Sequence, residues 1–120
     1  MNCLKQSTLL LALSAAACGQ LDHKDYVNAR AEAECKNLRS CARGYFESEY
    51  KDYEDCVDEV GDTIDDRDDD LPKECDYDGV EARECVSRIR SMTCEEYVEG
   101  STSSACDLVW RHDGGVWCGG

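Results

Sequence analysis

Residues 25–64 are DYVNARAEAECKNLRSCARGYFESEYKDYEDCVDEVGDTI, and their apolar and cysteine side chains recur at the three- and four-residue spacing of an α-helix. A first stripe comprises Val27, Ala31, Cys35, Leu38, Cys41 and Tyr45, and a second comprises Tyr50, Tyr53, Val57, Val60 and Ile64. The first stripe predicts a helix from Asp25 to Gly44, and the second predicts a helix that starts near Ser48. We expect an antiparallel hairpin with its turn at residues 43–47.

An aspartate-rich segment follows this hairpin and separates it from a third helix. Residues 65–72 hold five aspartates in six positions, so mutual repulsion and low helix propensity predict a solvated loop. Asp78 and Glu81 then have the spacing of a capping box, which predicts a third helix that runs to Met92.

The remaining chain predicts only short elements. Thr93 and Glu96 form a second possible capping box, residues 105–110 predict a short helix or extended piece, and residues 113–115 predict a turn. No alternating pattern is longer than four residues. The predicted fold class is therefore all-α, a small bundle of three to four short helices.

The composition indicates a fold that disulfides stabilise. The chain has 27 acidic and 13 basic residues, and its formal charge of -14 repels phosphate, which excludes nucleic acid as a partner. Leu, Ile, Val and Phe make up about 15% of residues 18–120, below the roughly 20% associated with disorder in highly charged chains. Eight of the ten cysteines follow Cys18. Disulfides stabilise thin cores by about 2–4 kcal/mol each and form outside the cytoplasm, so the composition predicts export.

Residues 1–17 have the three-part layout of a secretory signal peptide. Lys5 precedes an apolar run from Leu9 to Leu13, and the small residues of 14–17 follow. The apolar stretch is about ten residues long, within the range of a signal peptide and short of the roughly 20 residues that span a bilayer. We therefore expect a cleaved leader rather than a transmembrane helix.

The end of the leader, Ala15-Ala16-Ala17-Cys18-Gly19, resembles the lipobox of bacterial lipoproteins. The resemblance implies that Cys18 receives a diacylglycerol, becomes the mature amino terminus and gains a further acyl chain such as palmitate. Ala15 stands where the lipobox usually has Leu, and ordinary signal peptidase would cut the same bond, so simple secretion remains the alternative. The whole layout resembles small cysteine-rich lipoproteins of myxobacterial type, a resemblance that implies no activity.

The number of cysteines favours lipidation of Cys18. Cys3 leaves with the leader, and the eight cysteines after Cys18 form an even set, so an unmodified Cys18 would be the odd one. Gly19, rather than Asp, after the lipidated cysteine predicts sorting to the outer membrane, on its periplasmic face or at the cell surface. Residues 18–24 are then the lipidated cysteine and a short tether, and residues 25–120 are the helical domain.

Eight cysteines allow 105 disulfide pairings. The position of each cysteine along its predicted helix, measured from the turn, reduces that number. Cys35 lies about nine residues before the predicted turn and Cys56 about eight residues after it, roughly 12–13 Å along each axis, so these two are expected to pair. The other pairs rest on looser arguments of position, and alternatives to them stay open. They are Cys41 with Cys94, Cys85 with Cys106, and Cys75 with Cys118.

The candidate metal motifs fail on their spacing. Asp66, Asp68 and Asp70 match the first, third and fifth positions of a calcium EF-hand loop, but Leu71 replaces the Gly and Tyr77 the final Glu. A second register, from residue 74, ends in a cysteine. The closest cysteine spacing has five intervening residues, too wide for a zinc knuckle. We predict no metal and no cofactor.

The histidines match no catalytic motif. His23 falls in the predicted tether and His112 beside the predicted turn, so we predict no catalytic residue and no enzyme. Two groups of aromatic side chains could either pack in the core or form a surface that contacts a partner. They are Tyr45, Phe46, Tyr50 and Tyr53 at helical spacing, and Trp110 and Trp117 on either side of two glycines.

These expectations together predict a membrane-anchored extracytoplasmic lipoprotein that is a non-catalytic interaction module. Its partners would be the membrane, through the lipid anchor, and a protein or a glycan. The alternative is a secreted, unlipidated disulfide-rich effector or inhibitor domain.

Overall fold

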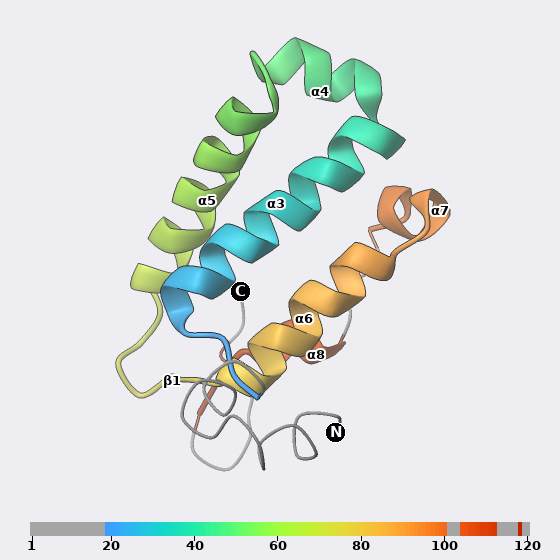
Figure 1. Ribbon diagram of the computed structural model, residues 1–120. Coiled ribbons are helices and arrows are strands. Elements are labelled where there is room, and N and C mark those ends of the chain that lie inside the picture. Colours follow the sequence, from blue (N-terminus) through green and yellow to red (C-terminus); the bar gives the residue numbers. More distant parts are fainter. Residues whose placement is uncertain (1–18, 101–103, 113–117, 119–120) are drawn as a thin grey trace, which may run out of the picture.

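The computed structural model describes residues 19–100, 104–112 and 118. Three long helices dominate this part of the chain: α3 (His23–Cys41), α5 (Tyr53–Asp69) and α6 (Gly79–Ser91). Helix α3 is central, with α5 along one flank and α6 along the other (Figure 1). The predicted fold class, a small all-α bundle stapled by disulfides, is confirmed.

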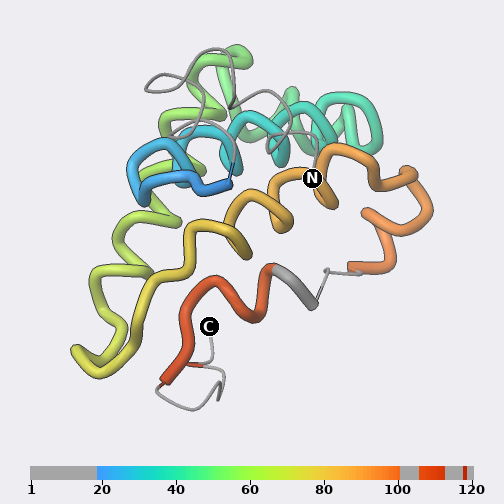
Figure 2. Tube along the Cα trace, turned by 60° about the horizontal axis from the view of Figure 1, so that its bottom comes forward, coloured from blue at the N-terminus to red at the C-terminus, as the bar shows by residue number. Residues whose placement is uncertain are grey.

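Short elements connect and flank these helices. Helix α4 (Arg43–Glu49) crosses between the ends of α3 and α5, and α7 (Cys94–Val98) follows α6 (Figure 1). Helix α8 (Ser104–Asp107) packs on α6, so that α6 lies between α3 and the last described segment (Figure 2). Strands β1 (Asp76–Tyr77) and β2 (Trp110–Arg111) form one antiparallel pair.

Aspartate and threonine side chains begin the helices. Asp22, Asp52 and Asp78 each accept hydrogen bonds from backbone N–H groups in the first turn of α3, α5 and α6, respectively. Thr93 and Glu96 form the predicted capping box of α7, with both reciprocal hydrogen bonds present.

The core consists of two small clusters. The larger joins α3, α5 and α6, and its buried members are Tyr26, Ala31, Ala33, Ile64, Ala82, Cys85, Val86, Ile89 and Val109. The smaller lies under α4 and comprises Phe46 with Cys35 and Cys56. Buried Asn37 donates a hydrogen bond from Nδ2 to the Ile89 carbonyl oxygen at 2.9 Å, which ties α3 to α6.

Four disulfides staple these elements together. They are Cys35–Cys56, Cys41–Cys94, Cys75–Cys118 and Cys85–Cys106, with Cα–Cα distances of 6.0, 5.1, 6.2 and 4.5 Å. These pairs coincide with the pairing expected from the sequence. Four disulfides are typical of a protein that folds in an oxidising, extracytoplasmic environment. Among the described residues, no helix combines the length and the apolar character that crossing a membrane requires.

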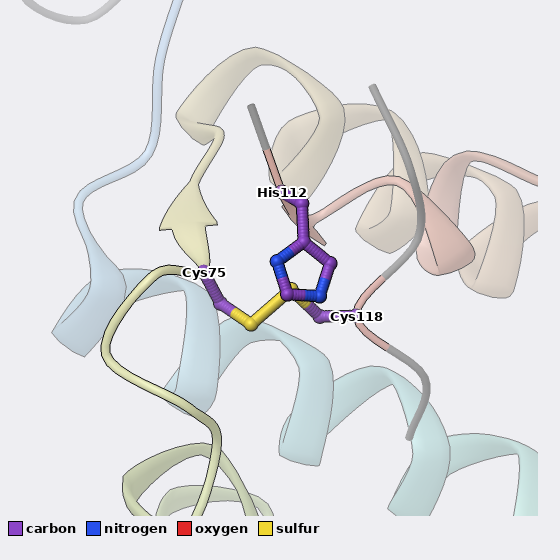
Figure 3. Close-up of side chains that lie close together, drawn as sticks. All are labelled: Cys75, His112 and Cys118. Carbon is purple, nitrogen blue, oxygen red and sulfur yellow. A yellow bond between two sulfur atoms is a disulfide. The ribbon is translucent and has the colours of Figure 1, made fainter. Parts of the chain in front are cut away.

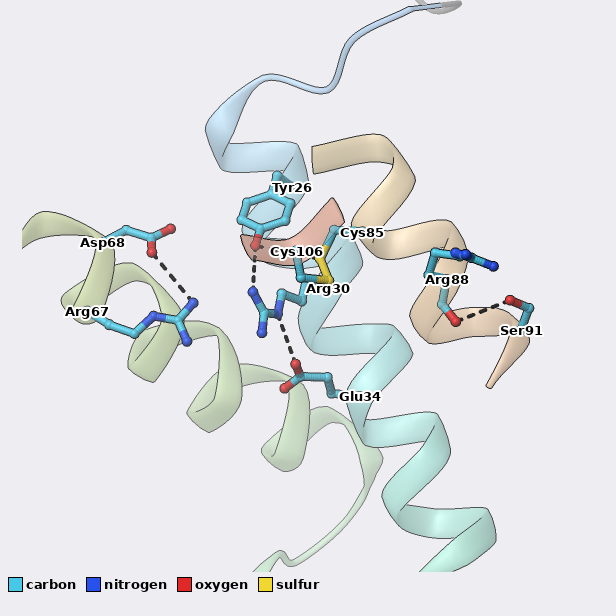
Figure 4. The surroundings of a disulfide bond; sticks show 9 residues. All are labelled: Tyr26, Arg30, Glu34, Arg67, Asp68, Cys85, Arg88, Ser91 and Cys106. Atoms are coloured by element: carbon cyan, nitrogen blue, oxygen red, sulfur yellow. Dashed lines mark hydrogen bonds and ion pairs between the residues drawn. A yellow bond between two sulfur atoms is a disulfide. The ribbon is translucent and has the colours of Figure 1, made fainter. Parts of the chain in front are cut away.

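A polar network surrounds the Cys85–Cys106 bridge (Figure 4). The Tyr26 hydroxyl lies 4.0 Å from Cys85 Sγ, and Arg30 Nη1 donates to that hydroxyl oxygen at 2.6 Å. Arg30 Nε in turn donates to Glu34 at 2.9 Å, and the arginine side chain is only 13% exposed. Burial lowers the pKa of Arg30, but the neighbouring Tyr26 and Glu34 outweigh it and hold the pKa above its usual value.

Three sequence-based boundaries are wrong. The turn predicted at residues 43–47 is helix α4, and the chain reaches α5 through residues 50–52 instead. The predicted aspartate loop is helical as far as Asp69, because Ile64 and Asp68 anchor that turn in the interior. The predicted tether extended to Lys24, but α3 begins at His23, since Asp22 already caps it.

Candidate functional site

A groove lies between α3 and α5. Its larger part has a volume of about 440 Å³, with His23 and Val27 of α3 facing Val57, Asp58 and Asp62 of α5. A second hollow of about 260 Å³ continues from it along α5, since both are lined by Val57 and Asp58. The two together are called the α3–α5 groove below.

His23 lies at one end of this groove and is held by Asp68. Its Nε2 lies 2.8 Å from Asp68 Oδ2, and the two side chains are 30% and 2% exposed. An ionised carboxylate can only accept, so in that state Nε2 carries the hydrogen of this bond. Arg67 Nη2 lies 3.6 Å from the other oxygen of Asp68 and also balances its charge.

Aromatic rings enclose the imidazole on its inner side. Tyr77 and Trp110 meet the His23 ring edge to face, with centroid distances of 5.5 and 5.6 Å, and Tyr26 lies 6.3 Å away. Burial, and then the nearby Tyr26 and Asp22, raise the pKa of the Tyr77 phenol well above its usual value. The Tyr77 hydroxyl donates to the Leu21 carbonyl oxygen at 2.6 Å, which fixes the chain just before α3.

The groove offers groups for binding cations. The larger hollow is lined by Asp58, Asp62 and Asp65, with Lys24 and Asn28 on the α3 side. These carboxylates do not converge on one point: among the described residues, only Cys75, His112 and Cys118 have three ligand atoms within 4.8 Å of one another. The groove therefore suits an extended or organic cation better than a single metal ion.

No family model, curated protein or solved structure matches this chain significantly. The groove must therefore be interpreted from its own residues.

The cluster of Cys75, His112 and Cys118 is a disulfide beside an imidazole (Figure 3). The sulfur atoms of Cys75 and Cys118 are bonded to each other, so neither is the thiolate that zinc requires. In this oxidised state the cluster offers His112 alone as an ordinary metal ligand. His112 therefore lies beside the Cys75–Cys118 disulfide. That the protein has no catalytic residue stays a prediction.

The aromatic residues singled out from the sequence have different roles. Phe46 is buried in the smaller core cluster, and Tyr50 and Tyr53 pack against it, whereas Tyr45 is 54% exposed. Trp110 is half-buried against the larger cluster. Whether the two tryptophans form a contact surface falls partly outside the described residues, since Trp117 is not among them.

His23, which the sequence pattern placed in the tether, belongs to the groove instead. The sequence does indicate that the helix starts at residue 23. Leu21, just before the cap residue Asp22, and Tyr26, in the first turn, have the positions of a hydrophobic staple. Asp68, the partner of His23, differs from the other four aspartates only in its spacing of four residues from Ile64. The neighbouring valines, Val27 and Val57, looked like core but are only half-buried and form the groove floor.

Proposed function

We propose that this protein is a lipid-anchored lipoprotein of the bacterial outer membrane whose helical domain is a non-catalytic interaction module. The observation that carries the proposal is the cysteine pairing. The eight described cysteines pair with each other, which leaves Cys18, in the lipobox-like segment, outside these four bridges. In the proposal, Cys18 carries the lipid anchor instead of forming a disulfide with one of these eight.

The start of the described fold also supports the proposal. Leu21 donates from its backbone N–H to the Gly79 carbonyl oxygen at 3.1 Å and accepts from Tyr77 at 2.6 Å. The chain is therefore fixed to the domain three residues after Cys18, a span of about 10 Å at most. An anchor on Cys18 would hold the start of α3 and the start of α6 close to the membrane.

This attachment gives the module an orientation. Helix α3 has 19 residues and is about 28 Å long, so α4 and α7, at its other end, would point away from the lipid (Figure 1). The α3–α5 groove runs along the side of the domain and stays open to partners in the same compartment. Several acyl chains on one cysteine provide lasting attachment.

Mass spectrometry of the membrane-extracted protein tests the proposal. We expect a mature chain that begins at Cys18 and carries acyl chains, and we expect Cys18→Ser to lose membrane association. An unmodified Cys18 thiol in the native protein, or a Cys18→Ser variant that remains in the membrane, contradicts it. A mature, unlipidated protein in the medium would instead identify the secreted effector or inhibitor, which Ala15 and Ala17 permit through ordinary signal peptidase.

A further inference from the structure

The floor of the α3–α5 groove is apolar and open. Val27 and Val57 line it and are only half-buried, and Gly61 of α5 also lines it. A Cβ at position 61 would lie 3.8 Å from Ala31 Cβ and 3.9 Å from Val27 Cγ1, so a larger side chain there would fill the groove. Glycine at this position keeps apolar surface accessible to another molecule.

One rim of the groove is a stripe of carboxylates on α5. Glu54, Asp58, Asp62 and Asp65 follow one another at intervals of four, four and three residues, and all four are exposed. None of them makes an ion pair with a residue that the structure describes. Like charges at this spacing destabilise a helix by about 0.2–0.5 kcal/mol per pair, so the free protein bears a repulsion that a cationic partner would relieve.

We propose that the α3–α5 groove binds a basic amphipathic helix of a partner protein. The acidic stripe from Glu54 to Asp65 is about 16 Å long, which matches three turns of a partner helix. Apolar side chains of that helix would contact the valine floor, and Lys or Arg side chains at three- and four-residue spacing would pair with the rim. The proposal rests on the interaction module proposed above and names its binding surface.

The shape of the groove favours a helix over other cations. Val27, Val57 and Tyr53 give both hollows some apolar lining, which the side chains of an amphipathic helix could cover and a small polycation could not. The strands β1 and β2 have two residues each and offer little edge to an extended peptide. An anionic membrane or a nucleic acid would be repelled by the same carboxylates.

Peptide binding to the full mature protein, purified in the form that cells make, tests this surface. The probe is an end-capped 14-residue peptide of Leu, Lys and Ala with Lys on one edge and Leu on the adjoining face of a helix. Fluorescence anisotropy in 150 mM salt reports the affinity. We expect Asp58→Asn with Asp62→Asn to weaken binding at least tenfold, and a scrambled peptide of the same composition to bind at least tenfold more weakly.

Two further variants separate a groove from general charge attraction. Asp66→Asn with Asp69→Asn makes the same charge change on exposed positions of α5 outside the groove, and we expect less than a twofold effect. Gly61→Leu fills the groove without changing charge, and we expect at least a tenfold loss. Circular dichroism of each variant verifies the helical fold.

The opposite results would overturn the proposal. Equal losses in the two aspartate pairs, or unchanged binding by Gly61→Leu, would mean non-specific attraction. Spermine that competes completely at the peptide's own affinity would indicate a small polycation, and a concentration-dependent dimer that Gly61→Leu abolishes would indicate a second copy of this chain. Because the assay reads peptide affinity and not membrane attachment, its failure is distinguishable from the failure of the lipid anchor, which the mass of Cys18 reports.

Discussion

His23 Nε2 and Asp68 Oδ2 lie 2.8 Å apart, although 45 residues separate them in the chain. This contact joins the first turn of α3 to the last turn of α5 at one end of the groove. Five aspartates near the carboxyl end of α5 interact unfavourably with the helix dipole, which is negative at that end. His23 and Arg67 offset this repulsion at Asp68, the one of the five that is buried.

The first prediction concerns this buried carboxylate. Asp68→Ala should lower the free energy of unfolding by about 1–3 kcal/mol, because it removes a buried carboxylate and leaves the partly exposed His23 ring without its partner. Asp66→Ala, on the exposed side of the same helix end, should change stability by less than about 0.5 kcal/mol. Urea unfolding under non-reducing conditions measures both. Equal effects in the two variants would show that the His23–Asp68 contact contributes nothing specific.

The same contact shows where sequence-based prediction reaches its limit. The two apolar stripes predicted the helices α3 and α5, because burying an apolar face at helical spacing requires little knowledge of the tertiary structure. The aspartate run predicted a loop, because repulsion is local, whereas burial of Asp68 depends on a histidine far away in the chain. Asp68 lies four residues after Ile64 on the same helix face, but this spacing identifies it only if the helix continues through the aspartate run.

The disulfide Cys35–Cys56 illustrates a prediction that tolerates a local error. The expected turn at residues 43–47 is helix α4, yet the two cysteines still lie at equal heights. Helix α4 crosses the ends of α3 and α5 instead of extending either, so the longer connection leaves their relative height unchanged (Figure 1). The groove could not be predicted in this way, because its lining depends on how α3 and α5 are rotated about their axes.

The second prediction compares two arginine–glutamate pairs, each at i and i+4. Arg30→Met keeps most of the apolar stem but leaves Glu34 and the Tyr26 hydroxyl without their donor, so stability should fall by about 2–4 kcal/mol. Arg43→Met breaks the exposed pair with Glu47 and should cost less than about 0.5 kcal/mol. Thermal unfolding by circular dichroism provides the comparison. Similar melting temperatures would argue that Arg30 is better solvated than the structure indicates.

The third prediction uses Gly79, where the chain before α3 lies against the start of α6. A Cβ at this position would lie 2.6 Å from the Leu21 carbonyl oxygen, so Gly79→Ala must displace that segment. We expect a loss of about 1–3 kcal/mol and faster proteolysis near the amino terminus. A variant as stable and as protease-resistant as the native protein would contradict the tight attachment of Leu21.

The fourth prediction is the opposite result for another glycine. Gly61 lies inside α5, and a Cβ there meets its neighbours only at ordinary contact distances of 3.8 and 3.9 Å. Gly61→Ala should therefore stabilise the protein by about 0.5–1 kcal/mol, because alanine restricts the unfolded chain and favours the helix. Measuring it beside Gly79→Ala separates the two effects, since the substitution is the same. A loss of stability would mean that α3 and α5 approach each other more closely at this point.

The fifth prediction concerns alkaline pH and the Tyr77 phenol. Burial raises its pKa in the folded protein, whereas in the unfolded chain it loses its proton near pH 10. Above that pH the unfolded state binds fewer protons than the folded state, so stability should fall as the pH rises further. Buried Tyr26, whose pKa burial also raises despite its Arg30 neighbour, should add to the fall.

Tyr77→Phe distinguishes this titration from general alkaline denaturation. The variant should be less stable than the native protein at pH 8 by about 1 kcal/mol, because it loses the hydrogen bond to the Leu21 carbonyl oxygen. Between pH 10 and 11 its stability should fall less steeply, because one phenol that resists ionisation in the fold is gone. Urea unfolding at pH 8, 9, 10 and 11 gives the two curves. Parallel curves would show that Tyr77 ionises equally easily in the folded and unfolded chains, and that its ring is not enclosed beside His23.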